Sequence, residues 1–203
     1  MKKLTLIIIL LSTLNSFAQK RTKIFFEDFV ECFYSEKATE SISIHNSPNE
    51  NKIAELSLLT EPHCWYKFAI SESKKGWLKI ENIIVGPGCG ENELNKDIGK
   101  HKGKWIQAKN LMINIGHSGE TRIGCLIDKT DKGFAKIGYR FYSAPTINSE
   151  IEFCVEGYVE SELIEINGTW AKLKIENNGK EYIGWLERKY QCAYPWTTCP
   201  VYD

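Results

Sequence analysis

The sequence predicts a mainly β protein, and three observations carry that prediction. Two Asn-Gly pairs, Asn167-Gly168 and Asn178-Gly179, separate three runs that are rich in Val, Ile, Leu, Tyr and Trp. Asn-Gly is typical of a type I′ hairpin turn, because both central residues must adopt positive φ. Leu173 and Ile175 alternate with lysines, which is the period of a half-buried strand. The third observation is an imperfect internal repeat of residues 41–85 in residues 138–190.

Residues 1–19 have the pattern of a secretory signal peptide. Lys2 and Lys3 precede an apolar run from Leu4 to Leu14, and the segment ends in small residues at Ser16-Phe17-Ala18. A run of this length is short for a membrane span, so the alternative of a retained anchor helix is disfavoured. No Cys follows the run closely, so there is no lipobox. We expect an exported protein, periplasmic or secreted, with no stable membrane span after cleavage.

Seven cysteines follow in the chain, and export makes disulfides plausible chemistry for them. Seven is an odd number, and leaving one out allows about 105 pairings, so the connectivity stays open. The candidate for a disulfide between cysteines close in sequence is Cys192–Cys199. The alternative is that several of the cysteines are buried thiols that pack as small hydrophobic groups.

The chain divides into five expected segments. After the signal peptide, Phe25, Phe26, Phe29, Val30 and Phe33 fall on one helical face, which predicts a short amphipathic helix within 20–37. The alternative is a pair of strands, because Phe and Val are modest helix formers. A first β domain is expected over 38–118, with a long polar loop at 86–103. A second domain follows at 119–190, and a tail rich in Cys and aromatic residues at 191–203.

Within these segments, apolar runs bounded by turn residues predict the strands. Alternation of Ile42 and Ile44 with serines marks a strand before the Ser47–Asn51 turn. The last three strands form an antiparallel meander over about 159–166, 169–176 and 181–187. The other expected strands are Ile53–Leu59, Trp65–Ile70, Gly76–Ile80, Lys104–Ala108, Leu111–Ile115, and a hairpin of Thr121–Ile127 with Phe134–Phe141.

The internal repeat compares 41–85 with 138–190. Each stretch has a strand, a Ser/Pro turn, a strand that opens with Trp65 or Trp170, and a last strand that opens with Gly76-Trp77 or Gly184-Trp185. In this order of motifs the chain resembles the bacterial SH3-like (SH3b) family. The match is full over 138–190, while 41–85 looks like a degraded copy. The resemblance implies two small SH3-like β-barrels in tandem, acting as a binding module.

Composition and motifs disfavour several other functions. Lys+Arg and Asp+Glu are equal at 26 each, so no charge imbalance points to nucleic acid. The four histidines are widely spaced, so no metal site and no cofactor is expected. Gly116-His117-Ser118-Gly119 is one residue short of a nucleophile elbow, so a small hydrolase is the least favoured alternative and we expect no catalysis.

Binding is expected to fall on aromatic side chains, which combine apolar area with a polar tip. By resemblance the ligand is expected to be cell-wall peptide or glycan, and the partner therefore peptidoglycan. The alternative is a protein-interaction or inhibitor role toward an extracytoplasmic protein. Tyr142 and Trp196 are expected to be exposed, while Trp170 and Trp185 could instead fill the barrel core. The candidate residues are Tyr139, Tyr142, Trp170, Trp185, Tyr190, Tyr194 and Trp196, with Trp65 and Trp77 in the first copy.

Overall fold

The strands form one antiparallel sheet in the computed structural model, which describes residues 26–35, 38–59, 61, 63–89, 91–116, 125–132 and 138–194. The mainly β fold class is therefore confirmed. The sheet is open, and the two closed barrels that the resemblance implied are not confirmed. The signal peptide lies outside the described residues and stays a prediction, as do the domain boundaries.

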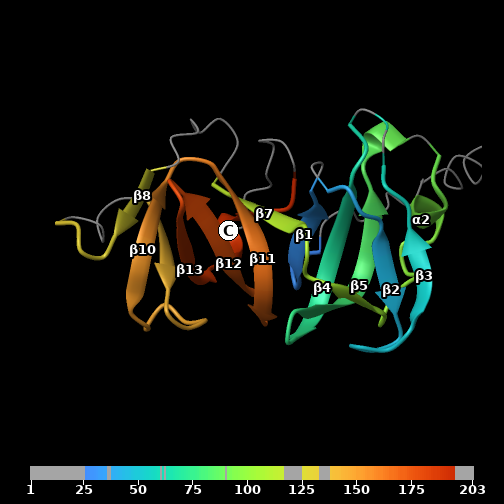
Figure 1. The fold of residues 1–203 in the computed structure, drawn as a ribbon, viewed down its shortest axis with the longest axis horizontal. Helices are drawn as coiled ribbons and strands as arrows, with labels where there is room; N and C mark the ends of the chain where they lie inside the picture. Colours follow the sequence, from blue (N-terminus) through green and yellow to red (C-terminus); the bar gives the residue numbers. More distant parts are fainter. Residues whose placement is uncertain are drawn as a thin grey trace, which may run out of the picture.

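Seven strands precede residue 117. The first six enclose one half of the molecule, and β7 runs between the halves (Figure 1). They are β1 (Val30–Tyr34), β2 (Ile42–His45), β3 (Lys52–Leu56), β4 (Tyr66–Lys74), β5 (Trp77–Val85), β6 (Trp105–Gln107) and β7 (Leu111–Ile115).

The remaining strands build the second half. They include the predicted meander, whose three strands are confirmed to within about a residue at each end. They are β8 (Cys125–Asp128), β9 (Tyr139–Tyr142), β10 (Ile151–Glu156), β11 (Val159–Asn167), β12 (Trp170–Asn177), β13 (Lys180–Leu186) and β14 (Gln191–Cys192).

The two halves have the same strand order. The sheet runs β3-β2-β6-β5-β4-β1-β7-β11-β12-β13-β9-β10-β8, so β3-β2-β6-β5-β4 corresponds to β10-β9-β13-β12-β11. We call residues 30–110 the first repeat and residues 125–194 the second repeat. Between them, β7 pairs with β1 and β11, as well as with β14. The internal repeat is therefore a real architectural feature.

Irregularities in the pairing fix the correspondence residue by residue. The register of β2 with β3 shifts between Ile44 and His45, and that of β9 with β10 shifts at the matching place, between Ile151 and Phe153. The hairpins β4–β5 and β11–β12 share a second such shift, after Ile70 and after Leu163. β-bulges at matching places are designed features rather than accidents of pairing.

This correspondence corrects the alignment of the repeat that was made from sequence. Trp77, which opens β5, is equivalent to Trp170, which opens β12. Trp105 in β6 is equivalent to Trp185, because each pairs with the last residue of the neighbouring strand, His45 in β2 or Tyr142 in β9. The sequence comparison was shifted by one hairpin, because residues 86–103 fill the place of the short Asn178-Gly179 turn.

The predicted N-terminal helix is wrong where the structure describes it. Residues Val30–Tyr34 form strand β1, and all five are buried. Val30, Cys32 and Tyr34 belong to the main hydrophobic cluster, whereas Glu31 and Phe33 alternate with them and lie on the opposite face of the strand. A strand covered on both faces reads as a continuous apolar run, and such a run is easily mistaken for one face of a helix.

The predicted hairpin of 121–127 with 134–141 is also wrong. β8 and β9 do not pair with each other; both pair with β10, one on each side of it. The stretch 86–103 is more regular than a loop, since it contains η2 (Pro87–Cys89) and α2 (Glu93–Lys96). The side chain of Asn95 holds it to the sheet by hydrogen bonds to the backbone of Val85.

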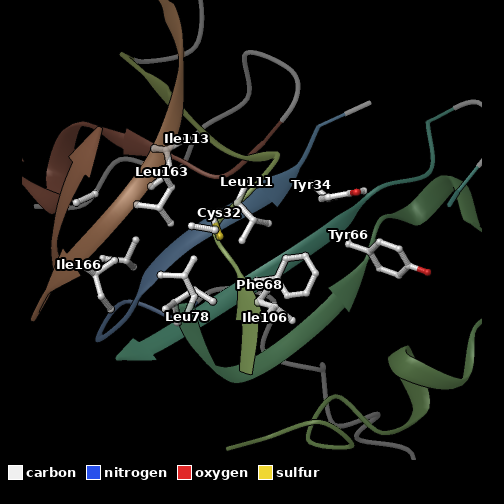
Figure 2. Close-up of a cluster of buried hydrophobic side chains, with 14 of the residues drawn as sticks. Cys32, Tyr34, Tyr66, Phe68, Leu78, Ile106, Leu111, Ile113, Leu163 and Ile166 are labelled. Carbon is white, nitrogen blue, oxygen red and sulfur yellow. The ribbon is translucent and has the colours of Figure 1, made fainter. Parts of the chain in front are cut away.

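One hydrophobic cluster extends through both repeats. Phe68, Leu78 and Ile106 of the first repeat belong to the same cluster as Leu163 and Ile166 of the second (Figure 2). Ser73 of β4 also exchanges hydrogen bonds with the backbone of Ile166 at 2.9 Å. The repeats are therefore joined by a shared core. Among the described residues, no helix combines the length and apolar character that a membrane span requires.

Candidate functional site

The aromatic residues singled out from sequence lie in three separate places. Tyr142, Trp170 and Trp185 gather on one sheet face, with the rings of Tyr142 and Trp170 5.6 Å apart. Tyr139 and Tyr190 contact each other, with ring centroids 5.0 Å apart. Tyr194 lies at the junction of the repeats, and its ring is 5.3 Å from that of Trp65. Trp196 lies outside the described residues.

The first of these groups has a counterpart in the first repeat. Lys172 Nζ lies 5.7 Å from the ring of Trp185, and the equivalent Lys79 Nζ lies 5.7 Å from the ring of Trp105. The rings of His45 and Trp77 meet edge to face at 4.9 Å, as do those of Tyr142 and Trp170 at 5.6 Å. An arrangement present at the same positions of both repeats belongs to the architecture they share.

Burial agrees with a structural role for Tyr142 and Trp185, whereas Trp170 is only partly buried. Tyr142 is 6% exposed and Trp185 is 7% exposed, so the exposure that the sequence predicted for Tyr142 is wrong. Trp77 and Trp105 in the first repeat are each 7% exposed as well. Side chains this buried offer little surface to a ligand.

Two cavities adjoin around Tyr34 in the first repeat. One has a volume of about 320 Å³, and most of the side chains around it are hydrophobic; we call it the apolar cavity. The other has a volume of about 260 Å³, and most of the side chains around it are polar or charged; we call it the polar cavity. The first is lined by Tyr34, Ser35, Ala38, Leu58, Leu59, Cys64, Trp65 and Tyr66, and the second by Tyr34, Glu40, Ser41, Ile42, Ser43, His45, Gln107, Lys109 and Asn110.

Local contacts hold the walls of the apolar cavity. Tyr66 Oη donates a hydrogen bond of 2.9 Å to the carbonyl oxygen of Ser57, and Tyr34 Oη donates to the carbonyl oxygen of Glu40. The disulfide Cys64–Cys89 joins the start of β4 to the end of β5, with Cα atoms 4.7 Å apart. Gly86 leaves room for the ring of Trp65, since a Cβ at Gly86 would lie 2.8 Å from Trp65 Nε1.

The cavity walls also carry hydrogen-bonding capacity. Trp65 is 5% exposed, and its Nε1 has no hydrogen-bond acceptor among the described residues. Burial raises the pKa of both Tyr34 and Tyr66, so both phenols stay protonated at neutral pH. The aromatic rings beside aliphatic side chains suit a ligand with an apolar group, and the two phenol oxygens, whose protons are already donated to backbone carbonyls, can still accept a hydrogen bond from it.

In the second repeat, aromatic rings take the corresponding positions. Tyr139 in β9 is equivalent to Ile42 in β2. Tyr190 is equivalent to Asn110, because the carbonyl oxygen of each accepts a hydrogen bond from the residue that follows the neighbouring strand, Gly116 after β7 or Ser35 after β1. Ile42 and Asn110 both line the polar cavity of the first repeat. Tyr139 and Tyr190, two of the residues predicted to bind a ligand, therefore lie in the second repeat at positions equivalent to the cavity lining of the first repeat. Tyr34 and Tyr66 were missed by sequence reasoning, and the signal that could have found them is the correct alignment of the repeats.

A buried charged cluster lies at the junction of the repeats. Glu31 of β1 contacts Lys67 Nζ at 2.8 Å and Arg188 of η4 (Arg188–Tyr190) at 3.0 Å. Glu31 and Lys67 are each 1% exposed, and the ring of Tyr194 lies 5.1 Å from Lys67 Nζ. Burial lowers the pKa of Lys67 and raises that of Tyr194. The cluster ties the C-terminal segment to the first repeat.

Two observations bear on metal and thiol chemistry. Among the described residues, no group of three or more His, Cys, Asp or Glu side chains gathers that could hold a metal ion. Desolvation raises the pKa of the Cys32 thiol, the opposite of what an activated nucleophile needs. His117 and Ser118 lie outside the described residues. Cys192 is disulfide-bonded, but its predicted partner Cys199 also lies outside them, so that pairing stays a prediction.

Comparison with known proteins identifies no family for this chain. No family model and no curated protein matches it. The solved structure of NlpC2 from Trichomonas vaginalis aligns over 85% of this chain with 12% identity and a TM-score of 0.30. The chain spans about half the length of that protein, 50% of which is covered. A TM-score this low carries no conclusion about fold or function.

Proposed function

We propose that this chain is an exported, non-catalytic binding protein built from two SH3-like repeats, and that it binds cell-wall peptide at the first repeat. The observation that carries the proposal is the pair of adjoining cavities around Tyr34, one surrounded mostly by hydrophobic side chains and the other mostly by polar ones. Export is supported by the signal-peptide pattern at residues 1–19, and the disulfide Cys64–Cys89 is compatible with an oxidising compartment.

The two linings favour a peptide over a glycan. Leu58, Leu59 and Trp65 form an apolar wall that suits a hydrophobic side chain. Ser41, Ser43 and Gln107 line the second cavity and can exchange hydrogen bonds with a peptide main chain. Because Tyr34 lines both cavities, a short extended segment can occupy the two at once.

The test is co-sedimentation of residues 20–203 with insoluble peptidoglycan. Leu58 is 37% exposed, so Leu58→Glu places a charge in the apolar cavity at little cost in stability. We expect this variant to bind at least about tenfold more weakly, since about 1.4 kcal/mol of lost contact is sufficient for that. Ile147→Glu is the matched control, because Ile147 is 62% exposed in a turn of the second repeat.

Soluble competitors then identify the ligand. Peptide fragments of the wall should release the protein from the pellet, whereas glycan strands should not. Release by glycan alone would replace peptide with glycan as the ligand. Full recovery of the wild type in the supernatant would contradict wall binding and favour a protein partner, to be sought by pull-down from periplasmic extract.

A further inference from the structure

We propose that strand β3 of the first repeat is a docking edge, to which an extended peptide adds as a further antiparallel strand. This inference rests on the proposed function and names how its peptide ligand is held. It comes from the one strand by which the two repeats differ. In the second repeat β8 pairs with the outer side of β10, whereas β3, the equivalent of β10, ends the sheet within the described residues.

The register of β8 on β10 predicts the register of the docked peptide. Leu126 lies opposite Val155 and packs against the hydrophobic cluster, and Asp128 lies opposite Phe153. Val155 is equivalent to Leu56 of β3, and Phe153 is equivalent to Ala54. A peptide in the place of β8 therefore sets an apolar side chain opposite Leu56, where it covers the same rim of the core.

The matching β-bulges in β10 and β3 predict a second contact between the peptide and β3. In the second repeat, Lys129 follows β8 and contacts Glu152 at 2.8 Å. The equivalent of Glu152 in the first repeat is Ile53, which is 48% exposed. An apolar residue at the position of Lys129 would cover Ile53. The expected ligand thus has two apolar residues, three positions apart along an extended chain.

The edge leads directly into the apolar cavity. Ser57 and Leu58 follow β3, and Leu58 lines the cavity of about 320 Å³. Because the added strand is antiparallel, residues N-terminal to its first apolar side chain run past Ser57 toward Leu58. Main-chain hydrogen bonds along β3 and a side chain in the cavity then act together, which is the usual division of affinity and specificity in strand addition.

The probe that tests this is a peptide made from the β8 segment, residues 122–130, with Cys125→Ser and Lys129→Leu. It is titrated into the ¹⁵N-labelled protein, and the backbone amide shifts are followed. We expect saturable shifts at residues 53–58, with a dissociation constant below about 1 mM. A peptide that also carries Ile127→Pro cannot keep the strand pairing and should bind at least about tenfold more weakly.

Ile53→Lys is the protein variant for this edge. It should weaken peptide binding and wall binding together, because it removes the apolar contact at the edge. If Ile53→Lys still binds the wall while Leu58→Glu does not, the proposal that β3 is a docking edge is wrong, and the cavity alone is the binding site. Shifts at residues 151–156, or none at 53–58, would also overturn that proposal. Shifts at 53–58 that follow protein concentration without peptide would replace the peptide with a second copy of this chain.

Discussion

At the scale of single residues, the buried thiol of Cys32 shows how this core responds to pH. Cys32 is fully buried in β1, and desolvation, followed by the nearby charge of Glu31, raises its pKa above the ordinary value of 9.0. Above that pH the unfolded chain loses the thiol proton, whereas the folded chain keeps it. The unfolded state therefore binds fewer protons, and stability falls as pH rises.

The Cys32→Val variant tests this directly. Unfolding by urea should show the wild type losing up to about 1.4 kcal/mol per pH unit above pH 9 from this one group. The variant should lose less over the same range. A remaining slope is expected, because burial also raises the pKa of Cys154 and of Tyr194. Equal slopes in the two proteins would contradict the effect of Cys32.

At the scale of elements, the disulfide Cys64–Cys89 closes the open end of the β4–β5 hairpin. The two cysteines are 25 residues apart, and they flank the ring of Trp65 and its neighbour Gly86. Gly88 is packed so closely against His63 that an added Cβ would lie 2.5 Å from its carbonyl oxygen. The wall of the apolar cavity is thus assembled by the bond and by glycines that permit close approach.

Removal of this disulfide should cost both stability and binding. The double variant Cys64→Ser/Cys89→Ser should lower the free energy of unfolding by about 3.5 kcal/mol, the value expected for a loop of this length. Peptidoglycan binding should fall with it, because Trp65 loses its support. The Ile147→Glu variant again serves as control. Unchanged stability in urea would show that the hairpin holds this region without the bond.

At the scale of the whole molecule, the repeats form one folding unit. They share strand β7, a single hydrophobic cluster and the contacts of Glu31 with Lys67 and Arg188. Each of these would be broken if one repeat unfolded alone, and a buried carboxylate without its cations is costly. The tandem organisation seen in the strand order therefore does not imply two independent domains.

Unfolding should consequently occur in a single transition. Tryptophan fluorescence and far-ultraviolet circular dichroism should give the same urea midpoint. A fragment of residues 119–203, which lacks β7, should not fold on its own, because β11 and β14 lose their common neighbour. Two separate transitions, or a folded fragment, would contradict the shared core.

The sequence by itself determined the local structure of the meander formed by β11, β12 and β13. Asn178 and Gly179 both have positive φ, as the type I′ turn requires, and the strands on either side follow the alternation of apolar residues. The other Asn-Gly pair is displaced by one residue, since Asn167 pairs with Trp170 and the turn is Gly168-Thr169. Turn chemistry and side-chain periodicity are short-range properties, so they can be read from the chain.

Only the tertiary structure decided the partners of those strands. The position of β8 beside β10, the strand nature of β1 and the equivalence of Trp105 with Trp185 depend on contacts between residues far apart in sequence. The candidate site has the same origin. Tyr34, Leu58 and Trp65 come from three separate stretches, and only the folded sheet brings them around one cavity. Burial on both faces of a strand, and the open edge of β3, leave no periodic mark in a sequence.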